Sequence, residues 1–228
     1  MLEKQTHTQL IILIDPDKYN PDLIKLANKS KVSYIFVGGS ILKKNTFEKT
    51  IKSIKSITKI PVVIFPGDET QVSKHADAIL MLSLLSGRNA EYLIGKHVKA
   101  ASKIKASNLT VIPTGYILID GNNTSTTQKV TKTKPLTKKK EIIETAIAGD
   151  LLGKKLIYLE AGSGAKKTLA NSIIKDVKES INIPLIIGGG INSVLKAKNI
   201  LKSNPDYMVI GNALEKHPEL LIDINKLF

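Results

Sequence analysis

Eight short apolar segments recur along the chain, and their number and spacing limit the folds that it can adopt. They are rich in Val, Ile and Leu, and none alternates cleanly between polar and apolar residues. Continuous apolar strands of this kind are buried on both faces, as in parallel sheets. The segments are Leu10–Ile14, Tyr34–Val37, Pro61–Phe65, Ala78–Leu82, Thr110–Ile112, Leu156–Leu159, Pro184–Ile187 and Tyr207–Ile210.

Helical patterns lie between most of these segments, with apolar residues recurring three and four positions apart. Eight strands that alternate with helices in 228 residues predict a (β/α)8 barrel, formed by residues 1–228 as a single domain. A doubly wound open sheet is the alternative. The helical patterns lie within Leu23–Ala27, Ile51–Ile57, Leu93–Ala101, Ile142–Ile147, Leu169–Val177 and Val194–Leu201.

Two connections differ from the regular pattern. The connection between Phe65 and Ala78 has room for at most a brief helical turn, so we expect the third helix to be missing or vestigial. The connection from Gly115 to Lys140 is long and polar. No core could form between Thr124 and Thr133, and we expect a loop there.

The chain carries a formal net charge of +14, and almost all of the excess is lysine. Nucleic-acid readers use arginine and aromatic side chains, whereas this chain has one arginine, Arg88, and 4% aromatic residues, so we expect no nucleic-acid partner. The lysines indicate a solvated surface, or attraction to anionic substrates or to an anionic membrane face. No cysteine is present, which excludes disulfides and thiolate chemistry. No signal pattern begins the chain, and we expect a cytoplasmic protein.

The segment Tyr158-Leu159-Glu160-Ala161-Gly162-Ser163-Gly164 places one carboxylate beside a glycine-rich turn. Glycine lets the backbone approach a ligand closely and direct its N–H groups at an anion. A carboxylate in this setting suits an enzyme that holds a phosphorylated alcohol and takes the proton of its hydroxyl. Glu160 is therefore the candidate general base; the alternative is a partly exposed glutamate that pairs with a lysine.

Two further apolar segments also end in glycine. Gly188-Gly189-Gly190 follows the seventh segment, and Gly211-Asn212 follows the eighth. In a barrel, the ends of strands seven and eight form the usual phosphate site, so the glycines indicate a phosphate cradle. The alternative is that they are ordinary turn glycines.

Hard oxygen ligands follow the first two segments. Asp15 is a candidate Mg²⁺ ligand, and the hydroxyl of Ser40 could supply a second oxygen. The alternative for Asp15 is an Asp-Pro turn that caps a helix. We interpret Asp17 and Lys18 as capping and surface residues. Arg88 could bind a diphosphate or form a loop salt bridge, and His75 and His97 are interpreted as structural.

The ordered set of motifs resembles the geranylgeranylglyceryl phosphate synthases and their heptaprenylglyceryl phosphate relatives in bacteria, over essentially the whole chain. Its second subgroup, which includes Bacteroidetes-type enzymes, is the more similar, since other members carry lysine at the position of Leu13. The motifs are Ile14–Lys18, Val37–Ser40, Phe65–Gly67, Ser86–Asn89, Gly115-Tyr116, Tyr158–Gly164, Gly188–Gly190 and Gly211-Asn212.

The resemblance implies a modified barrel without the third helix, and transfer of a prenyl group from a prenyl diphosphate to the sn-3 hydroxyl of sn-glycerol 1-phosphate, for ether-lipid synthesis. Geranylgeranyl diphosphate is the expected donor and heptaprenyl diphosphate the alternative. It also implies a homo-oligomer, either a dimer or a hexamer. A phosphate-binding barrel isomerase that uses Asp15 and Glu160 as acid and base is a further alternative.

By the motif match, Glu160 would take the hydroxyl proton, and Asp15 and Ser40 would hold the Mg²⁺ that carries the diphosphate. Tyr116 would lie on a mobile segment after strand five that closes over the prenyl chain, and Arg88 and Asn89 would lie on the prenyl diphosphate side. The glycerol 1-phosphate residues would be Tyr158, Leu159, Glu160, Ala161, Gly162, Ser163, Gly164, Gly189, Gly190, Gly211 and Asn212.

Overall fold

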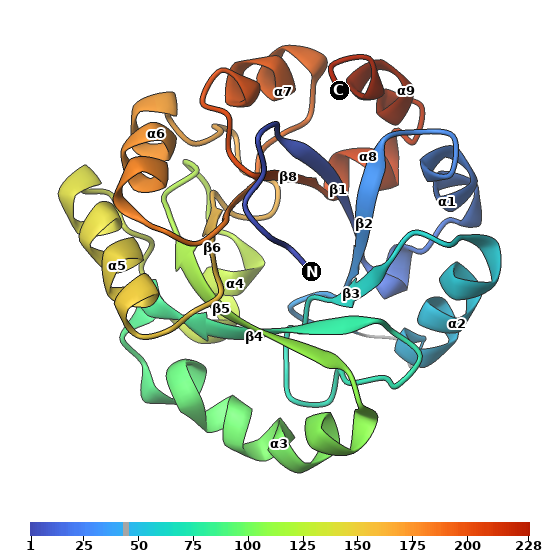
Figure 1. Cartoon of the computed structure of the whole chain (residues 1–228), viewed down its shortest axis with the longest axis horizontal. Coiled ribbons are helices and arrows are strands. Elements are labelled where there is room, and N and C mark those ends of the chain that lie inside the picture. The colour runs from blue at the N-terminus through green and yellow to red at the C-terminus, as the bar shows by residue number, and fades with distance from the viewer. Residues whose placement is uncertain (43–45) are drawn as a thin grey trace.

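A computed structural model describes residues 1–42 and 46–228. Eight parallel strands close into a barrel in which each strand pairs with its neighbours in sequence and β1 pairs with β8 (Figure 1). The predicted (β/α)8 barrel is thereby confirmed. The strands are β1 (Gln9–Ile14), β2 (Val32–Val37), β3 (Val62–Ile64), β4 (Ala78–Leu84), β5 (Thr110–Leu118), β6 (Leu156–Glu160), β7 (Leu185–Gly188) and β8 (Tyr207–Ile210).

Helices form a ring around the strands (Figure 1). None of the helices in the described ranges is long and apolar enough to cross a bilayer. The α-helices are α1 (Pro21–Ala27), α2 (Phe47–Ile57), α3 (Lys96–Ser107), α4 (Thr126–Thr131), α5 (Lys139–Leu151), α6 (Asn171–Ser180), α7 (Val194–Leu201), α8 (Asn212–Lys216) and α9 (Leu220–Asn225). Short 3-10 turns, η1 (Pro16–Lys18) and η2 (Leu85–Gly87), and a π-helical turn, η3 (Glu91–Gly95), complete the set.

The connection between β3 and β4 contains no helix, as the sequence predicts. The long connection after β5 differs from the prediction. β5 continues to Leu118, beyond the apolar segment Thr110–Ile112, and α4 lies within the segment Thr124–Thr133 that was expected to be a loop. α4 begins with a capping box. The Ser125 hydroxyl accepts the Gln128 N–H, and the Gln128 side chain accepts the Ser125 N–H.

Side chains of successive strand residues point alternately into the barrel and toward the helices. In β6, Tyr158 belongs to the cluster that fills the barrel, while Leu159 packs in the layer between strands and helices. This alternation decides which residues of a strand can reach the site at its end, and it places Tyr158 and Glu160 on the same face.

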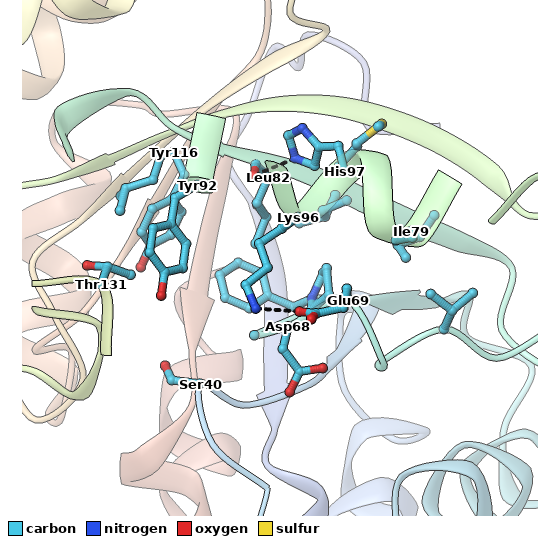
Figure 2. Close-up of a pocket in the computed structure, with 18 of the residues that line it drawn as sticks. Ser40, Asp68, Glu69, Ile79, Leu82, Tyr92, Lys96, His97, Tyr116 and Thr131 are labelled. Carbon is cyan, nitrogen blue, oxygen red and sulfur yellow. Dashed lines mark hydrogen bonds and ion pairs between the residues drawn. The ribbon is translucent and has the colours of Figure 1, made fainter. Parts of the chain in front are cut away.

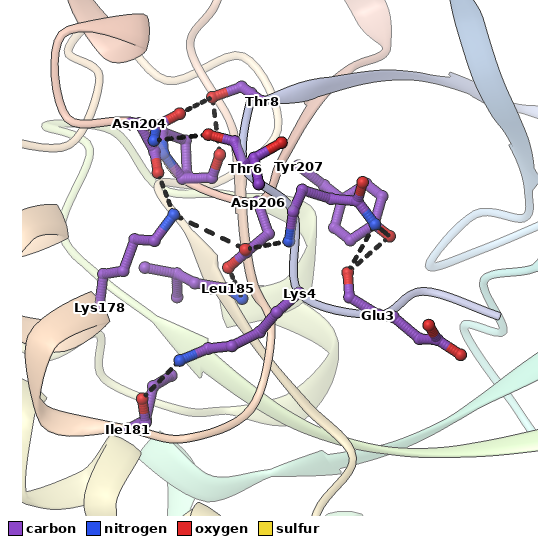
Figure 3. A network of polar contacts seen from close by, with 12 residues as sticks. Glu3, Lys4, Thr6, Thr8, Lys178, Ile181, Leu185, Asn204, Asp206 and Tyr207 are labelled. Atoms are coloured by element: carbon purple, nitrogen blue, oxygen red, sulfur yellow. Dashed lines mark hydrogen bonds and ion pairs between the residues drawn. The ribbon is translucent and has the colours of Figure 1, made fainter.

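Residues 2–8 close the amino-terminal end of the barrel (Figure 3). Leu2 is buried among the barrel residues. The backbone N–H of Gln5 donates to Asp206 at 2.8 Å, and the Tyr207 hydroxyl donates to the carbonyl of Glu3 at 2.9 Å. The Thr8 hydroxyl donates to the carbonyl of Pro205 at 2.6 Å.

Candidate active site

A polar pocket of about 580 Å³ lies at the carboxyl ends of the strands. It brings together residues from the ends of β1, β2, β6, β7 and β8, as expected for a barrel. Of the residues predicted for the site, the pocket is lined by Asp15, Ser40, Tyr116, Tyr158, Glu160, Ser163, Gly164, Gly189, Gly190, Gly211 and Asn212.

Glu160 ends β6 and is only 8% exposed. Its Oε1 accepts the N–H of Gly162 at 2.7 Å, and no described lysine or arginine pairs with it. Burial raises the pKa of this carboxyl to about 7, and the Gly162 N–H and the Tyr158 hydroxyl offset part of that effect. The alternative of an exposed glutamate paired with a lysine therefore does not hold. A carboxyl with a pKa near neutrality suits proton transfer.

The Tyr158 hydroxyl lies beside the Glu160 carboxylate, close enough to lower the pKa of that carboxyl. No partner meets hydrogen-bond geometry for it in the described chain, although it is fully buried and borders the pocket. Burying an unpaired hydroxyl is costly, so we treat it as available to a ligand.

Glycine at 188 and 189 allows the β7 turn to approach Glu160. A Cβ at Gly188 would lie 2.3 Å from the Tyr158 Oη and 2.8 Å from the Glu160 Oε2. Gly189 has a φ of +87°, and its Cβ would lie 2.3 Å from the Glu160 Oε1. Any side chain there would displace the carboxylate.

The turns after β6 and β8 are tied to each other at the pocket. The Asn212 amide donates to the Ser163 hydroxyl at 2.7 Å, and the Asn123 amide donates to the Ser163 carbonyl at 3.1 Å. With the backbone of Gly189 and Gly190, Ser163 and Asn212 line one wall with polar atoms and little side-chain bulk. The arrangement fits a phosphate monoester.

Asp15 lies at the end of β1 and does cap η1, since its Oδ1 accepts the Asp17 N–H at 3.0 Å. It also faces the pocket. Lys18, interpreted above as a surface residue, reaches back to it: the ammonium is 3.2 Å from the Asp15 Oδ2 and 3.0 Å from the Glu215 Oε2. Asp15 therefore both caps η1 and lines the pocket.

Ser40 follows Gly39, and a Cβ at Gly39 would be only 3.5 Å from the Asp15 Oδ1, so the turn that carries Ser40 passes beside Asp15. Its hydroxyl faces that of Thr127 at 3.5 Å. No cluster of three or more His, Cys, Asp or Glu side chains suited to a metal occurs within residues 1–42 and 46–228. Carboxylate and hydroxyl oxygens nevertheless suit Mg²⁺, which binds few protein groups and keeps waters or phosphate oxygens.

An apolar cavity of about 120 Å³ adjoins the polar pocket, and the two share Ser40, Phe65, Tyr116 and Thr127 (Figure 2). It lies between the helix-free β3–β4 connection and α3. An ion pair of 2.5 Å between Lys96 and Glu69 spans these two walls. Its apolar lining comes mostly from Val72, Ile79, Leu80, Met81, Leu82, Leu84, Ala100, Ile104 and Val130.

Tyr116 belongs to β5 itself and is buried, so it does not lie on a segment after strand five as expected. Burial, reinforced by the charge of Glu160, raises the pKa of its phenol. Its ring contacts Tyr158 and Phe65, with centroids 5.4 Å and 5.9 Å away. Tyr116 therefore forms part of the wall between the two pockets.

Five of the predicted residues lie outside the linings of the two pockets. Arg88 donates to the Leu85 carbonyl and to the Thr145 hydroxyl, which fixes it against α5. Asn89 accepts the N–H of Glu91 at 3.0 Å. The side chain of Leu159 points toward the helices, and Ala161 is buried beside Glu160. Gly162 contributes through its N–H to Glu160.

Sequence reasoning missed Lys18, Thr127 and Glu215 as pocket residues. Glu215 follows Asn212 by three positions and so lies one helical turn into α8, on the side that faces β1. This three-residue spacing from the turn after β8 could have predicted Glu215 as a pocket residue. Thr127 was hidden because α4 was not predicted.

The closed barrel, with a buried carboxylate among glycine turns and an apolar cavity alongside, defines a (β/α)8 enzyme for a small phosphorylated substrate and an apolar second one. The chain belongs to the PcrB family, whose model matches residues 3–226.

Several similar proteins are named geranylgeranylglyceryl phosphate synthase. The geranylgeranylglyceryl phosphate synthase of Chitinophaga pinensis is 46% identical over 216 residues, covering 92% of this chain and 86% of that protein. The synthase of Pyrococcus furiosus is 36% identical, covering 94% and 90%. The crystal structure of (S)-3-O-geranylgeranylglyceryl phosphate synthase from Thermoplasma acidophilum, in complex with its substrate sn-glycerol-1-phosphate, matches with a TM-score of 0.90 and 31% identity, covering 97% of this chain and 93% of that one.

Proposed function

We propose that this enzyme transfers the geranylgeranyl group of geranylgeranyl diphosphate to the sn-3 hydroxyl of sn-glycerol 1-phosphate. The product is an ether lipid phosphate, and diphosphate is released. Relatives named for this activity at up to 48% identity support the assignment, as does the T. acidophilum enzyme with its bound glycerol phosphate.

The observation that carries the proposal is the position of Glu160 beside the border of the two pockets. The polar pocket receives glycerol 1-phosphate, with its phosphate near Gly189, Gly190 and Asn212. Its hydroxyl then lies near Glu160. The first part of the prenyl chain enters the cavity behind Tyr116, which brings its first carbon to the boundary between the pockets.

Chemistry at this boundary is a displacement. The sn-3 oxygen forms a bond with the first prenyl carbon as the bond from that carbon to the diphosphate breaks. Glu160 accepts the hydroxyl proton, which requires its ionised form. The Tyr158 hydroxyl is placed to orient the glycerol hydroxyls, and the buried ring of Tyr116 and the partly buried ring of Phe65 exclude water from the reacting carbon.

A Mg²⁺ ion fits beside Asp15 and Ser40, where it would neutralise charge that develops on the leaving diphosphate. The Lys18 ammonium between Asp15 and Glu215 supports this placement, since the position already accepts a positive charge. Arg88 and Asn89 have no part in the proposal, because neither lines a pocket.

The test mixes labelled sn-glycerol 1-phosphate with geranylgeranyl diphosphate and Mg²⁺, followed by extraction of the lipid phosphate. We expect product with the wild-type enzyme and loss of at least about a hundredfold in rate with Glu160→Gln. Failure of every prenyl diphosphate from geranylgeranyl to heptaprenyl to give product would refute the proposal. The relative rates of these donors decide the chain length.

We further propose that residues 1–228 act as one domain in a homo-oligomer, either a dimer or a hexamer, in the cytoplasm. Sedimentation equilibrium measures the oligomeric state. The lysine-rich surface agrees with attraction of anionic substrates to the pocket. Contact with an anionic membrane face stays a prediction, to be tested by vesicle flotation.

A further inference from the structure

The ammonium of Lys18 is held at the mouth of the polar pocket by two carboxylates. It lies 3.2 Å from the Asp15 Oδ2 and 3.0 Å from the Glu215 Oε2. Its side chain is 54% exposed. Because packing restrains so exposed a side chain little, the two carboxylates determine where the ammonium lies.

The two carboxylates differ in their surroundings. The Glu215 side chain is only 6% exposed, and its Oε1 accepts the backbone N–H of Asp15 at 3.3 Å. The Asp15 Oδ1 is occupied by the Asp17 N–H. The Asp15 Oδ2 faces only the Lys18 ammonium among the described polar contacts. Lys18 and an incoming cation would therefore compete for the Asp15 Oδ2.

We propose that Lys18 is an exchangeable counter-cation of Asp15, which occupies the cation position in the free enzyme and is displaced when a divalent ion binds. The inference rests on the assignment of Asp15 to the metal in the proposed function. An ammonium on a flexible four-carbon chain can swing away without backbone movement. Glu215 keeps it within the pocket after displacement, since that carboxylate lies on α8 and holds Lys18 independently of Asp15.

Displacement of Lys18 lowers the affinity for the divalent ion, because the lysine–carboxylate contact must first be broken. Breaking an ion pair as exposed as this one should change the dissociation constant of the divalent ion by about two- to fivefold. Removing the ammonium should therefore tighten metal binding, whereas removing a group that merely supports the fold would weaken it or leave it unchanged.

The chain contains a matched control for this effect. Lys25 and Asp22 have the same three-residue spacing as Lys18 and Asp15, with the ammonium 2.8 Å from the carboxylate. This pair lies on the exposed side of α1 and lines neither pocket. Lys25→Met removes the same charge as Lys18→Met and leaves the pocket intact.

The experiment titrates the full chain with Mn²⁺ alone, without substrates, and follows free Mn²⁺ by electron paramagnetic resonance. We expect Lys18→Met to bind Mn²⁺ about two- to fivefold more tightly than wild type. Lys18→Arg, which keeps the charge, and Lys25→Met should both match wild type. Thermal unfolding of each variant checks that the fold is retained.

Equal or weaker Mn²⁺ binding by Lys18→Met overturns the proposal. Asp15→Asn separates this failure from a failure of the metal assignment. If Asp15→Asn abolishes binding while Lys18→Met has no effect, only the role of Lys18 is wrong. If Asp15→Asn binds Mn²⁺ like wild type, or if wild type and Lys18→Met both fail to bind, the metal assignment and the role of Lys18 are both wrong.

Discussion

Replacement of Glu160 by glutamine should make the protein more stable at high pH while it removes activity. The pKa of Glu160 rises from 4.5 to about 7 in the folded protein, chiefly because the carboxyl is buried. The folded state therefore binds a proton that the unfolded chain has released between these two values. Stability is then lost as the pH rises toward 7, because the buried group must ionise.

The size of the effect follows from the same two values. At 1.36 kcal/mol for each tenfold change in the protonation equilibrium, ionised Glu160 costs about 3 kcal/mol above pH 7. At pH 5 the cost is about 1 kcal/mol, since the unfolded carboxyl is then only partly ionised. Glutamine keeps a carbonyl oxygen for the Gly162 N–H and carries no charge.

Equilibrium urea unfolding of wild type and Glu160→Gln at pH 5 and pH 8 measures this difference. We expect the free energy of unfolding of the variant, minus that of wild type, to be about 2 kcal/mol larger at pH 8 than at pH 5, which means a relatively more stable variant at pH 8. Glu144→Gln, at a side chain that is 62% exposed, is the control and should change by less than about 0.5 kcal/mol at either pH.

A difference between wild type and Glu160→Gln that stays constant from pH 5 to pH 8 would mean that burial does not perturb the pKa of the carboxyl. The measurement needs no substrate, so the ionisation of a bound phosphate does not enter. The rate of the wild-type enzyme should correspondingly fall as the pH drops below about 7, as Glu160 becomes protonated.

Gly188→Ala should lower kcat/KM at least about tenfold, because the new methyl group would lie 2.3 Å from the Tyr158 Oη. An unchanged kcat/KM would show that the turn after β7 can shift without disturbing the site. Chelation with EDTA should abolish lipid formation and added Mg²⁺ should restore it, while lipid formation that survives EDTA would contradict the role given to Mg²⁺. Leu2→Ala should lower the free energy of unfolding by about 2 kcal/mol, since Leu2 is buried in the barrel end; a change below about 0.5 kcal/mol would mean that residues 2–8 are dispensable for closure.

The barrel was predictable because each strand is a continuous apolar run, which only burial on both faces explains. The missing third helix was predictable from length alone, since 66–77 cannot hold a strand-to-strand helix with its turns. Helix α4 was missed because its apolar content is low. The sequence signal for α4 was the capping box of Ser125 and Gln128, which is hard to recognise within a polar segment.

The candidate site was predicted in part. Strand ends and glycines indicated Glu160, Asp15 and the turns after β7 and β8, because a parallel barrel gathers these at one end. The burial of Glu160 could not be read from the sequence, since it depends on how closely Gly188 and Gly189 approach from another strand. The contact of Lys18 with Glu215 joins residues 197 positions apart, which no local pattern reveals.

Closure at the amino-terminal end also has a consequence for how the chain folds during synthesis. Gln5 and its partner Asp206 are 201 positions apart, and β1 completes its pairing only with β8. During synthesis, one edge of β1 therefore stays unpaired until nearly the whole chain has left the ribosome. Unpaired strand edges can pair wrongly with other chains. We expect the pairing of β1 with β8 to be the last part of the barrel to form; Asp206 supports it, because its carbonyl accepts the Gln9 N–H and its carboxylate accepts the N–H groups of Gln5 and Leu185. Substitutions at Asp206 should consequently reduce the yield of folded protein more than they change the chemistry at the far end.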